Sequence, residues 1–219
     1  MILALTTIFF VLGLVIGSFL NVVIFRLNTQ RSFGGRSACM SCQNKLVWYE
    51  LIPVFSFLFL RGRCRNCKTR ISIQYPLVEL ATGLVFSLLF LKLEELFFLS
   101  TFMWSAAYAY YAAVFSLLLV IAVYDIRHKI IPDELSLVFG ILAFIGLFIF
   151  DSGFYGFPIF SLHVPSVLEF LSGILAALPF YLFWLISYGK WMGLGDAKLA
   201  IGLGWLLGEA SGGLRSIAR

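Results

Sequence analysis

Apolar residues dominate this chain in long runs that short polar segments separate. The runs occupy Met1–Phe25, Pro76–Leu91, Leu96–Val123, Leu135–Phe150 and Val164–Ser187, and a further run opens near Asp196. Most are close to the roughly 20 residues that a helix needs to cross a bilayer. None alternates apolar and polar residues as barrel strands do, so helices must satisfy the backbone within lipid. The pattern predicts an all-α, polytopic membrane protein with about six transmembrane helices.

The composition agrees with a protein whose main solvent is lipid. Hydrophobic residues make up 61% of the 219 residues and charged residues 12%, and the mean hydropathy is +0.99. Soluble domains have about twice that share of charge. The first run is expected to be a retained span, because Arg26 follows its apolar part and no basic residue precedes it. Leu51–Leu60 contains Pro53 and is too short to cross, so we expect an interfacial segment or hairpin within a loop.

One loop, about Arg26 to Gln74, carries most of the positive charge. Its only acid is Glu50, against nine basic residues: Arg26, Arg31, Arg36, Lys45, Arg61, Arg63, Arg65, Lys68 and Arg70. The positive-inside rule predicts that this loop is cytoplasmic. Counting onward, Lys92–Leu96 and Asp151–His163 fall outside, and Asp125–Pro132 and Lys190–Lys198 fall inside. Topology and anionic headgroups account for the net charge of +5, so we expect no nucleic-acid partner.

All four cysteines lie in that basic loop, as Cys39-Met-Ser-Cys42 and Cys64-Arg-Asn-Cys67. Two C-x2-C pairs separated by 21 residues are typical of a zinc ribbon. The alternatives are two disulfides or a redox dithiol, which a reducing cytoplasm disfavours. Four sulfur ligands close the site, so the metal is expected to be structural. The neighbouring Arg63, Arg65 and Lys68 are expected to favour the thiolate forms.

Two aspartates are the candidates for chemistry. Asp125 ends the third span, where the helix macrodipole opposes an acid. Asp196 follows Gly193-Leu194-Gly195 and opens the last apolar run, a position where an acid can also be a plain helix cap. Both fall on the same predicted side of the membrane, and ionisable groups near lipid are costly and often functional. Two carboxylates that share one proton can hydrolyse a peptide bond through an activated water. The two glycines are expected to let backbone and substrate approach closely.

Other polar residues suit structural roles. Asp133 and Glu134 are expected to be the cap and the first-turn acid of the fourth span. Glu79 is expected either to contact a proton or substrate or to pair with a loop arginine. Ser18 and Asn21 are expected to form hydrogen bonds between helices.

Several motifs resemble those of the bacterial type IV prepilin leader peptidases, which also act as N-methyltransferases. The likeness covers nearly the whole chain. It includes both cysteine pairs and these segments: Gly17-Ser18-Phe19-Leu20-Asn21, Trp48-Tyr49-Glu50-Leu51-Ile52-Pro53, Arg61-Gly62-Arg63-Cys64, Tyr75-Pro76-Leu77-Val78-Glu79-Leu80, Asp125-Ile126-Arg127-His128-Lys129-Ile130-Ile131-Pro132-Asp133 and Gly193-Leu194-Gly195-Asp196.

This resemblance implies a bifunctional enzyme of the bacterial inner membrane. It would cleave the basic leader of type IV prepilins or type II secretion pseudopilins with Asp125 and Asp196, and then methylate the new N-terminus from S-adenosylmethionine. It also implies two domains: residues 1–92, with the first two spans and the tetracysteine loop, associated with methyl transfer, and residues 96–210, the aspartic endopeptidase membrane domain. Only 23 residues follow Asp196, so the chain is expected to be truncated or a short member.

Two other interpretations stay open. One is an intramembrane protease of the presenilin or signal-peptide-peptidase type, which shares the Gly-x-Gly-Asp element, although the tetracysteine loop argues against it. The other is a zinc-ribbon membrane scaffold or a small transporter without catalytic activity, in which the aspartates cap helices or bind a cation. A transporter is expected to carry more polar residues at the membrane midplane or broken helices.

Overall fold

The computed structural model is almost entirely helical and divides into two compact units, Met1–Lys92 and Leu93–Arg219. It describes residues 1–29, 34–152, 158–160 and 164–216, with side chains left out for 151–163 and from 209 onward.

The first unit is built on two antiparallel helices, α1 (Ile2–Arg26) and α3 (Gln74–Leu99). Stacked rings join the pair at both ends, Phe9 on Phe90 and Phe25 on Tyr75, each with centroids 4.8 Å apart. Between the rings, glycines bring the two backbones together. A Cβ on Gly13 would lie 2.7 Å from the Gly83 Cα, and one on Gly17 would lie 2.7 Å from the Glu79 Cα. Glycines four residues apart allow this kind of close helix packing in membranes.

Asn21 confirms the expected hydrogen bonding between helices. It is fully buried, and its side-chain amide donates to the Tyr75 carbonyl of α3 at 3.1 Å and to the Gly17 carbonyl of α1 at 3.3 Å. A buried amide costs free energy unless it is paired, so the bond fixes the register of α1 on α3.

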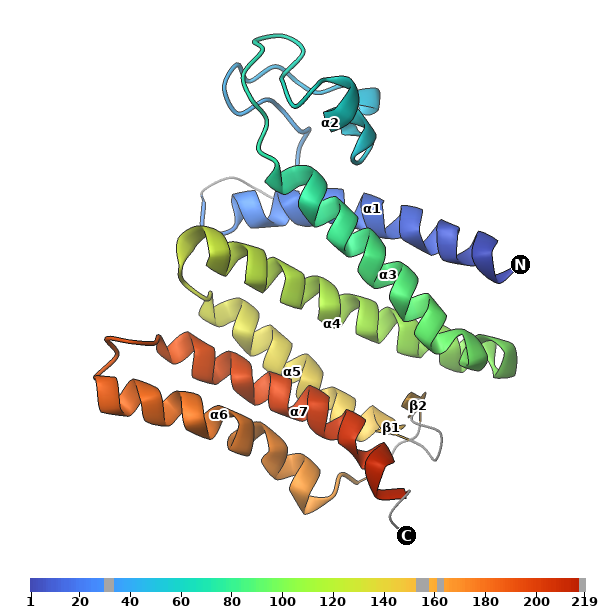
Figure 1. The fold of residues 1–219 in the computed structure, drawn as a ribbon, viewed down its shortest axis with the longest axis vertical. Helices are drawn as coiled ribbons and strands as arrows, with labels where there is room; N and C mark the ends of the chain where they lie inside the picture. Colours follow the sequence, from blue (N-terminus) through green and yellow to red (C-terminus); the bar gives the residue numbers. More distant parts are fainter. Residues whose placement is uncertain (30–33, 153–157, 161–163, 217–219) are drawn as a thin grey trace. The chain divides into compact units, whose positions relative to one another are not determined.

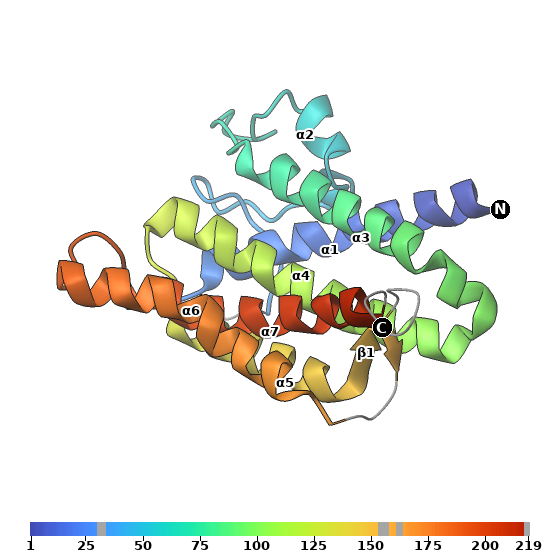
Figure 2. The same ribbon diagram turned by 60° about the horizontal axis from the view of Figure 1, so that its bottom comes forward.

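The loop between α1 and α3 contains a 3₁₀ turn, η1 (Trp48–Leu51), and a short helix, α2 (Phe55–Phe59). The expected interfacial segment, Leu51–Leu60, therefore folds as a turn and one short helix. α2 lies beside the α1–α3 pair in both views, not beyond its end (Figures 1 and 2). The hydrogen bond from the Val54 backbone N–H to Glu79 Oε2, 2.8 Å long, ties α2 to that position.

The second unit contains four long helices: α4 (Thr101–His128), α5 (Asp133–Ile149), α6 (Val167–Ser187) and α7 (Leu194–Ser216). α7 lies between α5 and α6 and packs on both (Figure 1). The Ser100 side chain caps α4, and a reciprocal Ser166–Glu169 capping box begins α6. Between α5 and α6, β1 (Phe150–Ser152) pairs antiparallel with β2 (Pro158–Phe160). The rest of the expected outer loop Asp151–His163 lies outside the described residues.

Four of the described helices, α1, α3, α4 and α6, are long and apolar enough to span a bilayer. The all-α membrane class is thus confirmed. For α5, which has 17 residues, and for α7, spanning stays a prediction. The prediction of a loop at Lys92–Leu96 is wrong. α3 continues to Leu99 because charge does not break a helix, and Leu93 and Leu96 within that stretch are buried.

Candidate active site and metal centre

The four cysteines meet in space. Their Sγ atoms all lie within 4.8 Å of one another, and those of Cys39 and Cys67 are 3.8 Å apart. Four ligands at a Zn–S distance of about 2.3 Å in a tetrahedron would be about 3.8 Å apart. The cluster therefore fits one tetrahedral metal ion, and thiolate ligands favour zinc.

Each cysteine pair sits on the same kind of tight hairpin. Backbone bridges join Ala38 to Lys45 and Arg63 to Arg70. The residue after the second cysteine of each pair, Gln43 or Lys68, adopts a positive φ of 57° or 59° and donates its N–H to the carbonyl of the first cysteine at 3.0 Å. This repeated turn places the two sulfurs of each pair on one side of its hairpin. The two hairpins come from different parts of the loop and together close the site.

The Cys67 thiol has a lowered pKa. Hydrogen bonding to the Thr69 hydroxyl and then to its backbone lowers the pKa of Cys67 to about 6. The sequence pointed instead to the basic neighbours Arg63, Arg65 and Lys68. The main cause is Thr69, which the hairpin brings to 3.3 Å from the Cys67 sulfur.

The two aspartates lie in the second unit at the ends of two different helices. Asp125 is in the last turn of α4 and Asp196 in the first turn of α7, and both are partly buried. One turn further into each helix, Ile121 and Leu199 belong to the same apolar cluster. The two carboxylates consequently occupy the same end of the unit, where α4 ends and α7 begins (Figure 1).

The start of α7 is held against the segment that joins α4 to α5. A Cβ on Gly195 would lie 3.1 Å from the Ile131 Cβ, tighter than ordinary contact, whereas one on Gly193 would meet nothing nearer than Asp196 Oδ2, at 3.8 Å. Of the two glycines, only Gly195 lies so close to another residue, Ile131, that a side chain would crowd it. Lys198 and Asp133 add an exposed ion pair of 2.7 Å between α7 and α5.

Two expectations for other acids need correction. Asp133 is not the cap of α5; Pro132 holds that position, and Asp133 is the first acid of the helix. Pro132 has the extended backbone that a cap needs, and its ring predisposes the helix to start. Among the loop arginines that the structure describes, a set that excludes Arg31, none pairs with Glu79. Its carboxylate accepts the Val54 N–H and a hydrogen bond from Ser18. This tie joins residues 25 positions apart, and no local motif signals it.

Comparison with known proteins identifies the family of this chain. A model of the Bacterial Peptidase A24 N-terminal domain matches residues 11–93, and one of the Type IV leader peptidase family matches residues 112–213. A curated protein of Pectobacterium carotovorum named prepilin leader peptidase/N-methyltransferase is 35% identical over 90% of this chain and 73% of its own length. The chain belongs to the type IV leader peptidase family. A relative with the same name from Klebsiella pneumoniae is 34% identical, covering 91% of this chain and 83% of its own length.

The chain spans a variable share of its relatives in this family. The protein of the same name from Myxococcus xanthus is 39% identical over 90% of this chain, but the match covers 55% of the relative. No solved structure gives a significant match to the chain. Both cysteine pairs fall within the first matched region, and Asp125 and Asp196 fall within the second.

Proposed function

We propose that this protein removes the leader peptide from prepilins or pseudopilins and that Asp125 and Asp196 carry out the cleavage. The observation that supports this most is that the ends of α4 and α7 share one apolar cluster through Ile121 and Leu199. Membership of the leader peptidase family supplies the reaction class. A substrate that crosses the membrane as a helix would present the start of its mature segment where the spans end, on the predicted cytoplasmic side.

In this proposal the two carboxylates share a single proton, because two negative charges at close range cannot both persist. The ionised carboxylate takes a proton from water as the water oxygen attacks the scissile carbonyl carbon. The protonated carboxyl donates a hydrogen bond to the carbonyl oxygen. The carbon–nitrogen bond then breaks, and the carboxyl that took the proton from water passes that proton to the departing amine. No covalent enzyme intermediate forms.

A structural zinc ion in the tetracysteine site is the second part of the proposal. Cys39, Cys42, Cys64 and Cys67 would hold it with all four positions filled, so it would order the loop and not touch substrate. Without such a centre, the loop has few buried apolar side chains to stabilise it: among the described residues of Arg61–Arg70, only Cys64 is buried.

Methyl transfer to the new N-terminal amine is the third part, and it rests on the relatives' name. S-adenosylmethionine would supply the methyl group when bound.

Cleavage in membranes tests the proposal. The full chain is co-expressed with a prepilin, and the mature N-terminus is sequenced for wild type, Asp125→Asn and Asp196→Asn. Asp133→Asn is the matched control, because it removes an exposed carboxylate at the same end of the unit. We expect cleavage to be lost in the first two variants and kept in the control. Cleavage at the wild-type rate by either aspartate variant would contradict the proposal, and an uncleaved substrate with all chains would favour a scaffold without catalytic activity.

A further inference from the structure

The loop between α1 and α3 exposes an apolar face that the proposed chemistry does not use. We call it the apolar loop face and define it as Trp48, Phe55, Leu58 and Phe59. Phe59 is 85% exposed and Trp48 is 76% exposed. Large aromatic side chains gathered on an exposed face mark a surface that meets a partner or a membrane. The ring of Phe57, by contrast, turns inward onto Gly62, where a Cβ would lie 3.0 Å from it.

The point where α2 is attached lies well back along α1 from the end of that helix at Arg26. Val54, which precedes α2, donates its N–H to Glu79, and Glu79 also bonds to Ser18 of α1. Ser18 is eight residues before Arg26, where α1 ends. At 1.5 Å per residue, α2 therefore begins roughly 12 Å back along α1 from its charged end. In a bilayer that α1 crosses up to Arg26, a segment in that position would lie at the depth of the outer hydrocarbon.

A strained turn holds the segment there. Val54 has φ 62° and ψ −49°, and the Phe55 N–H donates to the Pro53 carbonyl at 2.6 Å, which defines a γ-turn centred on Val54. A β-branched residue rarely adopts this conformation, so the surrounding contacts must hold it in place. The buried Glu79 carboxylate, 6% exposed, holds the Val54 N–H at the turn. The chain thus reverses at a fixed point beside α3.

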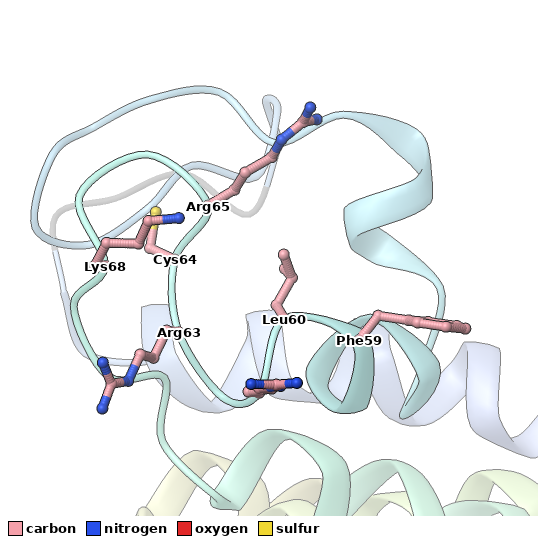
Figure 3. A pocket seen from close by; sticks show the side chains of 7 residues that line it. Phe59, Leu60, Arg63, Cys64, Arg65 and Lys68 are labelled. Carbon is pink, nitrogen blue, oxygen red and sulfur yellow. The ribbon is translucent and has the colours of Figure 1, made fainter.

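Basic side chains follow the apolar loop face directly. Arg61, Arg63, Arg65 and Lys68 line a pocket of about 480 Å³ together with Phe59 and Leu60. Figure 3 shows the Phe59 ring pointing away from Cys64 and Lys68. None of these four cations pairs with a carboxylate among the described residues; Arg65 instead contacts the Tyr49 ring, 5.5 Å from its centroid. Aromatic side chains beside cations that no carboxylate neutralises are the composition of segments that bind an anionic bilayer surface.

We infer that the apolar loop face inserts into the bilayer leaflet on its own side and that Arg61, Arg63, Arg65 and Lys68 contact anionic lipid headgroups. The occupant is lipid, because the face is tethered at membrane depth and its cations match headgroup phosphates. A basic leader peptide would be repelled by the same cations. The zinc hairpins would then be held at a constant height above the membrane surface. This inference does not depend on the proposed cleavage.

Photo-crosslinking tests the insertion. The photoreactive residue p-benzoylphenylalanine replaces Phe59 in the full chain, which is placed in nanodiscs of phosphatidylcholine and phosphatidylglycerol at 7:3. The matched control carries it at Met40, between the cysteines of the first pair and also exposed at 55%. We expect an adduct with the mass of one phospholipid at position 59 and none at position 40. Adducts at both positions, at neither, or only with a second protein chain would overturn the inference.

A second experiment tests the contact with anionic headgroups. The yield of the lipid adduct at position 59 is compared between phosphatidylcholine alone and the 7:3 mixture, with and without Arg61→Gln, Arg63→Gln and Lys68→Gln together. A basic side chain near an anionic surface contributes about 1 kcal/mol, or about a fivefold preference. We expect a severalfold rise in yield with phosphatidylglycerol and no rise in the triple variant. If phosphatidylglycerol raises the adduct yield equally with and without the three Gln substitutions, while both proteins keep their full zinc content, the assignment of these cations to lipid headgroups is contradicted.

Discussion

Replacing Gly204 by alanine should displace α7 and with it Asp196. Gly204 is buried where α7 crosses α6, and its carbonyl accepts a hydrogen bond of 2.8 Å from the Ser172 hydroxyl. A Cβ added there would lie 2.5 Å from the Ser172 carbonyl oxygen and 2.7 Å from the Ala176 Cβ and the Gly173 Cα. Ordinary contact begins at 3.4 Å, so the helices must separate by 0.7 to 0.9 Å.

Two opposing terms set the magnitude. Alanine gains up to about 1 kcal/mol over glycine in helix propensity, and overpacking of a close contact costs about 1–3 kcal/mol. We therefore expect a net loss of stability of up to about 2 kcal/mol. The effect on cleavage should be larger, because a misplacement of about 1 Å in a catalytic group can cost about 100-fold in rate.

The assay is leader cleavage in detergent or nanodiscs together with a thermal unfolding curve. Gly140→Ala in α5 is the matched control, since nothing lies within 4 Å of a Cβ at that position. It should keep wild-type cleavage and equal or higher stability. If Gly204→Ala cleaves within twofold of wild type and unfolds at the same temperature, the reasoning that α7 positions Asp196 through this contact is refuted.

Three further predictions concern the loop and the surface. Cys64→Ser should lower bound zinc, measured by mass spectrometry of the intact chain, and make the loop sensitive to protease, whereas Ser37→Ala beside the first pair should do neither. In chain stripped of metal, the alkylation rate of Cys67 should be half-maximal near pH 6, because its pKa is lowered to about 6 and its thiolate is lost as the pH falls through that value. A half-maximal rate near pH 8.5 would contradict this. Lys198→Met should change the free energy of unfolding by less than about 1 kcal/mol, since the ion pair with Asp133 is exposed, and a larger loss would show that the pair is structural.

Much of the architecture could be predicted from the sequence, because a segment that crosses lipid must be a long apolar helix. Apolar runs predicted the positions of the long helices, although both ends of α4 were five residues off, and the spacing of the cysteine pairs predicted their meeting. The end of α3 was missed because Lys92, Glu94 and Glu95 marked a loop by charge alone. Helix formers of either sign continue a helix when its apolar side, here Leu93 and Leu96, stays buried.

The remaining features depend on contacts between residues far apart in sequence. No pattern links Glu79 to Val54, because a buried carboxylate that accepts one backbone N–H has no local signature. The roles of Gly193 and Gly195 also could not be separated by sequence, although only Gly195 packs against Ile131. Chemistry at Asp125 and Asp196 is predicted by motif and family, and the shared cluster around Ile121 and Leu199 gives it a structural rationale.

The central claim is that Asp125 and Asp196 act as one unit, and single-turnover cleavage by Asp125→Asn, Asp196→Asn and the double variant tests it most directly. Residues that share one catalytic step are strongly non-additive. The account predicts that each single variant loses as much rate as the double variant, all reaching the same background. A single variant that keeps a measurable rate, with the double variant slower by the product of the two losses, would contradict it.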